Sequence, residues 1–269
     1  MNSAADPEGR RTAPAQPWSR FFLPVIAVLA FLLLWECYAR LVNPGPTVLP
    51  PLSQVVAAGW GDRINLASSL WPTVVEVGVG FAVSVTLAFL LSLVIQLIPS
   101  VRRAVLPLLI GSQTVPLVVL APLFVVWFGF GLLPKVLLIA LVTFFPIVVA
   151  LLDGYASADR ESVTVLQTMG ANRWQEYRLL RLPGALPALF TGIRISITYA
   201  VVAAVFAEYA GAERGLGVYL QGASKSFRTD LVLAGVLVSA VITVVLFVVV
   251  TAVERACLPW HAGVKAVTP

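Results

Sequence analysis

Charged residues are scarce in this chain of 269 residues: they account for 12% of it, whereas hydrophobic residues account for 59%. Water-soluble domains contain about 25% charged and about 45–50% apolar residues. A chain of this length cannot hide such an excess of apolar side chains in one or two cores. The composition therefore excludes a water-soluble globular domain and indicates an integral membrane protein.

Cysteine and histidine are nearly absent. The two cysteines, Cys37 and Cys257, form no disulfide framework and lie in apolar stretches, so we expect them to be buried as small hydrophobic residues. The single histidine, His261, is interpreted as part of a C-terminal tail. With so few metal-binding or nucleophilic side chains, the sequence argues against an integral membrane enzyme.

A nucleotide-binding loop is also missing. The chain has no Gly-x-x-x-x-Gly-Lys-Ser/Thr segment, so it cannot cradle nucleotide phosphates by that mechanism. The formal net charge of +5 comes from basic residues scattered between apolar runs, with no stripe that would suit nucleic acid. Any energy from ATP must therefore reach this chain through a partner.

Six apolar runs are long enough to cross a hydrocarbon core of about 30 Å, which takes about 20 helical residues. They lie near residues 21–42, 70–98, 104–128, 133–153, 187–210 and 231–257. The sequence thus predicts an all-α integral membrane protein with six transmembrane helices. We place this membrane domain at residues 20–260, between a disordered cytoplasmic tail at 1–19 and a C-terminal tail at 261–269.

The third run contains Pro107, Pro116 and Pro122. Proline removes helical hydrogen bonds, so we expect this run to kink or break and to be buried where neighbouring helices cover the freed carbonyls. Tryptophans flank the runs and are interpreted as anchors at the membrane surface: Trp18, Trp60, Trp71, Trp127 and Trp260.

The basic residues predict the orientation. If the N-terminus is cytoplasmic, twelve Lys and Arg residues lie on the inner side and six on the outer side. Because inner segments carry the excess of Lys and Arg, both termini are expected in the cytoplasm.

The long inner segment at residues 154–186 has helical patterns of its own. Residues 161–169 can form a short helix that Gly170 ends, because glycine tolerates positive φ. Asn172 can cap a second helix with Gln175 in a capping box. We expect this second helix to stop at Pro183, leaving an amphipathic helix between two short connections, a shape that suits the groove of a partner.

Ionisable and amide side chains inside apolar runs are costly and are functional candidates. Glu76 and Gln113 sit well inside their runs and could face a polar cavity, although a structural hydrogen bond between helices is equally compatible. The other such residues are Glu36, Gln96, Arg194 and Glu208. A stripe of small residues in the fifth run fits either a dimer seam or packing within one subunit: Gly192, Ser196, Ala200, Ala203, Ala207 and Gly211.

The stretch GANRWQEYRLLRLP at 170–183 resembles the cytoplasmic signature of binding-protein-dependent ABC importer permeases. In that signature a Glu-Ala-Ala triplet is followed by three residues, Gly, nine residues, an aliphatic residue, one residue and Leu-Pro. The spacing from Gly170 through Leu180 to Leu182 and Pro183 fits. The triplet itself is replaced by residues 164–166, Thr-Val-Leu, so the acidic start is missing.

Further motifs resemble one branch of this family, which serves nitrate, sulfonates, taurine and thiamine pyrimidine precursors. They are SQTVP at 112–116, APL at 121–123, WFGFG at 127–131 and EYAGAERGLG at 208–217. The substituted triplet, together with LPWH at 258–261, is most similar to permeases for hydroxymethylpyrimidine-type thiamine precursors. Riboflavin permeases are close relatives.

The resemblance implies a type I importer permease in the bacterial plasma membrane. Its partners would be a second copy of this chain, two copies of a P-loop ATPase and an extracytoplasmic solute-binding protein. Segment 211–230, in which we expect a short helix, could contact the solute-binding protein. The chain would be no enzyme and bind no cofactor, since ATP and Mg²⁺ belong to the ATPase. The ATPase-coupling residues would be Gly170, Ala171, Asn172, Arg173, Trp174, Gln175, Arg178, Leu182 and Pro183. The candidate pathway residues are Glu76, Gln113, Thr114, Pro116, Ser196, Tyr199 and Glu208.

A self-sufficient secondary transporter is the rival class. Such proteins normally show an internal repeat and intramembrane charges that form a relay. The two halves of this chain show no repeat, which favours the importer permease.

Overall fold

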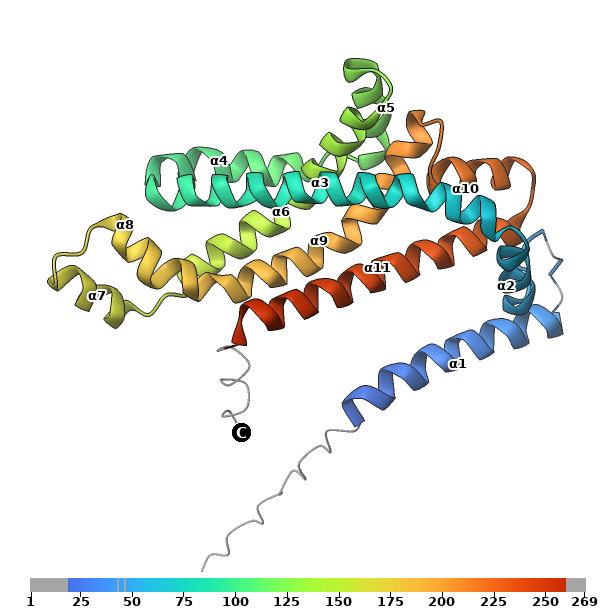
Figure 1. Cartoon of the computed structure of the whole chain (residues 1–269), viewed down its shortest axis with the longest axis horizontal. Coiled ribbons are helices and arrows are strands. Elements are labelled where there is room, and N and C mark those ends of the chain that lie inside the picture. The colour runs from blue at the N-terminus through green and yellow to red at the C-terminus, as the bar shows by residue number, and fades with distance from the viewer. Residues whose placement is uncertain (1–18, 43, 46, 260–269) are drawn as a thin grey trace, which may run out of the picture.

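The computed structural model describes residues 19–42, 44–45 and 47–259 (Figure 1). The expected tails, with Trp18, Trp260 and His261, lie outside the described residues, except for Ser19, which starts the first helix. The part of the chain that the structure describes contains helices and no strand. The all-α prediction is confirmed.

The elements follow in one series along the chain. They are α1 (Ser19–Val42), α2 (Leu52–Gly61), α3 (Arg63–Leu97), α4 (Pro99–Ser112), α5 (Leu117–Phe128), α6 (Leu132–Ala156), α7 (Arg160–Thr168), α8 (Arg173–Glu176), the π-helix η1 (Tyr177–Arg181), α9 (Leu182–Gly211), α10 (Leu216–Lys225) and α11 (Thr229–Cys257). The short helix expected within residues 211–230 is α10.

Within the described residues, five helices are long and apolar enough to cross a membrane: α1, α3, α6, α9 and α11. The expected third span is broken, because α4 and α5 meet at 101° across residues 113–116. Pro116 starts α5 in an extended conformation and has no N–H to continue the helical ladder of α4. Counted as one bent span, this pair brings the number of candidate spans in the described part of the chain to six.

The expectation that the third run is buried was wrong for the single chain. Of the described side chains in α4 and α5, only those of Leu109 and Ala121 are buried. The break turns α5 away from the line of α4, so that α5 meets the bundle along one narrow side, against Leu138 of α6 and Ala207 of α9. Leu117, Leu120 and Phe124 are half-buried beside this contact, and Val118, Val119 and Val126 remain exposed.

Helices α6 and α9 pack along much of their length and form the centre of the bundle, with α3 against α6 (Figure 1). The small-residue stripe of α9 lies at this contact, where Ser196, Ala200 and Ala203 are all buried. Ser196 donates a hydrogen bond of 2.8 Å to the carbonyl of Thr143 on α6. The stripe therefore packs within the subunit, since small side chains let the two backbones approach closely.

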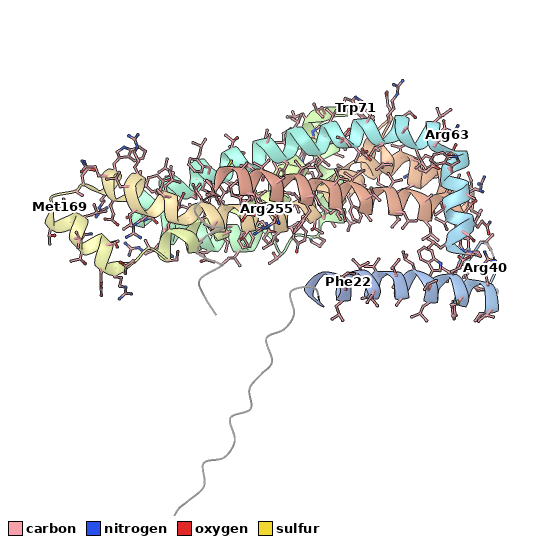
Figure 2. The ribbon with its side chains drawn as sticks, turned by 60° about the horizontal axis from the view of Figure 1, so that its bottom comes forward. Phe22, Arg40, Arg63, Trp71, Met169 and Arg255 are labelled. Atoms are coloured by element: carbon pink, nitrogen blue, oxygen red, sulfur yellow. The ribbon has the colours of Figure 1, made fainter. Side chains whose placement is uncertain are left out.

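Helix α1 runs apart from the other long helices in both views (Figures 1 and 2). It is tied to α2 by Glu36, which pairs with Arg40 at 2.6 Å and accepts a hydrogen bond from Ser53 Oγ at 2.8 Å. Cys37 on α1 and Cys257 at the end of α11 are both exposed. Their expected burial was wrong, because neither helix is covered on that side within one subunit.

The bundle has two ends of different construction. We call the end that carries α7, α8 and η1 the α8 end, and the end that carries α2, α10 and residues 129–131 and 212–215 the α10 end. Figure 2 shows Met169 at the first and Arg40 and Arg63 at the second. The helices α3, α6, α9 and α11 each run from one end of the bundle towards the other (Figure 1).

Candidate functional site

Helix α7 opens the α8 end and carries its own cap. The carboxylate of Asp159 accepts hydrogen bonds from the backbone N–H of Ser162 at 2.9 Å and of Glu161 at 3.4 Å. The hydroxyl of Ser162 also donates to this carboxylate, and these bonds hold the pKa of Asp159 below its usual value. The helix ends before Gly170, whose φ is +81°, as predicted.

Helix α8 begins with the predicted capping box. Asn172 Oδ1 accepts from the backbone N–H of Gln175 at 2.9 Å, and Gln175 Oε1 accepts from the N–H of Asn172 at 2.8 Å. The cap satisfies donors that the first turn of any helix leaves free. This local signal was sufficient to predict where α8 starts.

The predicted stop of this helix at Pro183 was wrong. The chain continues from α8 through η1 into α9 without a connection. The N–H of Leu182 donates to the carbonyl of Tyr177, five residues earlier, so the turn is wider than an α-turn. Pro183 directly follows this wider turn, where the α-helical hydrogen-bond ladder is already interrupted, so its missing N–H does not stop the helix. Helix α8 is therefore a direct extension of a membrane-spanning helix.

The predicted coupling residues gather at the α8 end. Most of them are exposed, and Trp174 has 50% of its surface accessible. Behind them Glu176 pairs with Arg181 at 2.6 Å, and Gln167 of α7 donates to Glu176 at 3.3 Å. The exposed residues of the predicted set are Gly170, Asn172, Arg173, Trp174, Gln175, Arg178 and Pro183, while Ala171 and Leu182 are half-buried. Together they offer a basic and aromatic surface to a partner.

At the α10 end, helix α10 has no side-chain cap of its own, because its N-cap is Gly215. Glu208 of α9 accepts from the N–H of Gly217 at 2.6 Å and from the hydroxyl of Thr73 at 2.5 Å. Thr73 Oγ1 in turn accepts from the N–H of Leu216 at 2.9 Å. Helix α10 is thus capped by residues of α3 and α9. A Cβ at Gly217 would collide with the backbone carbonyl of Val205, so this close approach requires glycine.

A second buried polar contact lies nearby. Lys135 of α6 donates to Glu76 Oε1 at 2.5 Å, and both side chains are about nine-tenths buried, with 10% and 6% exposed. A cavity of about 430 Å³ adjoins this pair and is also lined by Phe130 and Arg214. Glu76 therefore belongs to a charged cavity at the α10 end.

Gln113 lies in a different cavity, of about 580 Å³, at the break between α4 and α5. It shares this central cavity with three more of the candidate pathway residues, namely Thr114, Pro116 and Tyr199. None of the described residues that line the central cavity is charged. Glu208 lines neither cavity, and Ser196 is buried between α6 and α9.

Sequence reasoning missed two residues of these networks, Thr73 and Lys135. Thr73 carries an ordinary side chain in an apolar run, and no local pattern marks it. Lys135 was counted among the outer basic residues, although it lies in the first turn of a run that becomes a spanning helix. A lysine inside such a run was the available signal, since an unpaired charge there is costly.

The family described as "Binding-protein-dependent transport system inner membrane component" matches residues 80–258. The chain belongs to this family. It is therefore the permease subunit of an ABC importer, a multi-pass protein of the inner membrane. ATP hydrolysis in such importers is carried out by a separate subunit, so this permease is not itself an enzyme, and the family implies ATPase and solute-binding-protein partners.

Three relatives of this permease cover nearly its whole length. The formylaminopyrimidine transport permease ThiX of Halalkalibacterium halodurans is 36% identical over 88% of this chain and 95% of its own. The taurine permease TauC of Escherichia coli is 33% identical, covering 95% and 96%. The riboflavin permease RibX of Chloroflexus aurantiacus is 33% identical, covering 91% and 92%. The first two belong to the branch that the motifs indicated, and the third is a riboflavin permease, the class named beside that branch.

A solved structure shares the fold of this permease. The crystal structure of an amino acid ABC transporter with histidines superimposes with a TM-score of 0.58 at 14% sequence identity. The match covers 74% of this chain and 97% of that chain. At this identity the likeness shows the fold, and it confirms the helical permease architecture.

Proposed function

We propose that this permease imports a thiamine pyrimidine precursor of the hydroxymethylpyrimidine type, and that two copies of it form the pathway. The observation that carries the proposal is the 36% identity, over 88% of the chain, with a permease named for formylaminopyrimidine. The alternatives are riboflavin, taurine, other sulfonates and nitrate. The taurine and riboflavin permeases, each 33% identical, favour two of them.

The central cavity supports a neutral aromatic solute. The amide of Gln113 and the hydroxyl of Thr114 can bond to the ring nitrogens and amino group of a pyrimidine, and Tyr199 offers an aromatic surface. A sulfonate or nitrate would bring a negative charge into a cavity that has no cationic side chain among its described lining, and an unpaired charge at membrane depth is costly. We assign Gln113, Thr114, Pro116 and Tyr199 to the pathway, with Glu76 at the α10 end.

The same proposal places the α8 end and both termini in the cytoplasm. The segments on the side of the N-terminus carry twelve Lys and Arg residues against six on the other side, which supports this orientation. The exposed surface around Arg173, Trp174 and Arg178 then meets the ATPase, of which two copies bind ATP and Mg²⁺. The solute-binding protein docks at the opposite, α10 end.

Uptake into proteoliposomes tests the solute. The permease is reconstituted with its co-purified ATPase, and ATP-dependent import of labelled hydroxymethylpyrimidine is measured in the presence of its solute-binding protein. Excess unlabelled hydroxymethylpyrimidine is expected to abolish the signal, while taurine and riboflavin leave it unchanged. Import of taurine or riboflavin without import of the pyrimidine would overturn the proposed solute, and import without ATP would point to a secondary transporter.

Charge reversal tests the docking surface. Arg173→Glu is expected to abolish co-purification of the ATPase and ATP-dependent uptake without preventing membrane insertion, because Arg173 is exposed on α8. Arg255→Glu is the matched control, since Arg255 is an exposed arginine in the last turn of α11, outside α7 and α8. Normal uptake by the Arg173 variant would show that the ATPase binds elsewhere.

A further inference from the structure

A row of side chains leads from the exposed surface of α8 into the bundle. Trp174, half exposed, stacks on Tyr177 with ring centroids 5.6 Å apart and planes inclined by 25°. Tyr177 is 2% exposed and lies in the π-helix that joins α8 to α9. An exposed side chain of the α8 end is thus in direct contact with a buried one.

The row continues through hydroxyl groups to two other helices. Tyr177 Oη lies 3.2 Å from Tyr155 Oη at the end of α6, and the two rings pack edge to face at 5.4 Å. Tyr155 Oη lies 3.3 Å from Ser92 Oγ on α3. Tyr155 and Ser92 are completely buried. The row therefore joins α8, η1, α6 and α3.

Proton counting gives these hydrogen bonds a direction. Ser92 uses its one hydroxyl proton to donate to the carbonyl of Phe89 at 2.9 Å, so it accepts from Tyr155. Tyr155 has then used its own proton and accepts from Tyr177. Each hydroxyl group therefore donates to the next one in the row, and the last donates to the backbone of α3.

A second contact joins the same elements. Arg181, the last residue of η1, donates to the backbone carbonyl of Tyr155 at 3.0 Å and pairs with Glu176 of α8. Helix α8 has only four residues, too few to hold an orientation by itself. Its position is therefore set by its continuation through η1 into α9 and by these contacts to the end of α6. The π-helix at this junction is the kind of irregular turn often found at functional sites.

We propose that Trp174, Tyr177, Tyr155 and Ser92 are positioning residues that pass a displacement of α8 to α6 and α3 during the transport cycle. The inference rests on the proposed function, in which the ATPase contacts α8. The hydroxyls of Tyr155 and Ser92 are completely buried, so the residues of the row either move together or lose these hydrogen bonds at a cost in free energy. When α8 moves, the row carries α6, which lines the central cavity, and α3 with it.

The test uses a cysteine reporter that is independent of the solute. Cys37 and Cys257 are replaced by serine, Gln113→Cys places one thiol in the central cavity, and its reaction with a charged, membrane-impermeant maleimide is followed in the permease–ATPase complex. Tyr155→Phe, Tyr177→Phe and the double variant are compared with Tyr219→Phe. Tyr219 is the matched control, because its hydroxyl donates one hydrogen bond, of 2.7 Å to Asp62, at the α10 end.

ATP with vanadate is expected to change the labelling rate in the parent protein and in Tyr219→Phe to the same extent. In Tyr155→Phe and Tyr177→Phe the change is expected to shrink by about threefold, and the double variant is expected to resemble either single one, because both break the same row. ATP hydrolysis and ATPase co-purification persist, and thermal unfolding confirms that the variants are folded.

Three outcomes would count against the inference. The first is a change in labelling rate in both tyrosine variants as large as in the parent protein. The second is a reduction of that change no larger than in Tyr219→Phe, and the third is strictly additive reductions in the double variant. Each would show that the row does not transmit the movement and would leave the proposed function intact. A parent protein whose reporter ignores ATP and vanadate would instead contradict the proposed function, and the inference with it.

Discussion

The two ends of the bundle hold their short helices in opposite ways. At the α8 end, Asp159 and Asn172 cap α7 and α8 through backbone groups within three positions along the chain. At the α10 end, α10 depends on Glu208, nine positions away, and on Thr73, 143 positions away. A helix with local caps keeps its shape when the bundle rearranges, whereas α10 loses its cap if α3 and α9 separate.

The difference suits the roles proposed for the two ends. A docking element that moves with a partner must stay folded while it moves, and local hydrogen bonds provide that. The α10 end combines long-range caps with the buried Glu76–Lys135 pair, so its short helix and three spanning helices form one unit. The comparison predicts that single substitutions at the α10 end destabilise the whole protein, and that those at the α8 end act locally.

The largest effect is expected for Lys135→Met. It leaves the carboxylate of Glu76 buried without its cation, which costs roughly 3–5 kcal/mol of unfolding free energy. The melting temperature of the detergent-purified protein should fall steeply. Adding Glu76→Gln to this variant removes the stranded charge and should restore much of the loss, and a double variant as unstable as Lys135→Met would contradict this explanation.

Glu208→Ala is expected to cost about 2–3 kcal/mol, because the N–H of Gly217 loses its acceptor in the protein interior. Hydrogen exchange of the α10 amides and the global melting temperature should change together. Glu213→Ala is the control, because Glu213 is an exposed residue of the adjoining loop. It should change neither the hydrogen exchange of α10 nor the melting temperature. Faster exchange in α10 with an unchanged melting temperature would mean that this end is not one unit.

At the other end, Asn172→Ala is expected to cost about 1 kcal/mol of local helix stability. The lost capping box should speed hydrogen exchange of the first amides of α8 and leave the global melting temperature within error. Asn65→Ala provides a comparison, since Asn65 is an exposed asparagine that donates to Asp62 and caps no helix. A global loss of stability in the Asn172 variant would contradict the locality of this end.

The smallest effect is a dependence on pH at α7. The pKa of Asp159 is lowered in the folded protein by hydrogen bonds from Ser162, so its capping contribution is present above the unfolded pKa of about 3.9 and is lost as the pH falls through the folded value. Protection of the α7 amides, corrected for intrinsic exchange, should be constant from neutral pH down to about pH 5 and decline only in stronger acid. Asp159→Asn should remove this decline.

Features that depend on near neighbours were accessible from the sequence. Four features follow from residues a few positions apart along the chain. They are the apolar runs, the break at residues 113–116, the end of α7 at Gly170 and the capping box at Asn172. The exceptions came from context. The stop at Pro183 failed because a π-turn absorbs the missing hydrogen bond, and Cys37 and Cys257 are exposed because hydrophobic residues of a membrane protein can face lipid as well as a core.

The sequence by itself determined that the chain is a helical membrane protein, where most of its helices lie, and which family its motifs resemble. Only the tertiary structure decided which polar residues meet: Glu76 with Lys135, Glu208 with the start of α10, and Tyr177 with Tyr155 and Ser92. The reason is physical. Local caps and apolar runs depend on chain neighbours, whereas these pairs depend on how helices far apart in sequence are rotated and shifted against one another, and the packing of all side chains between them sets that register.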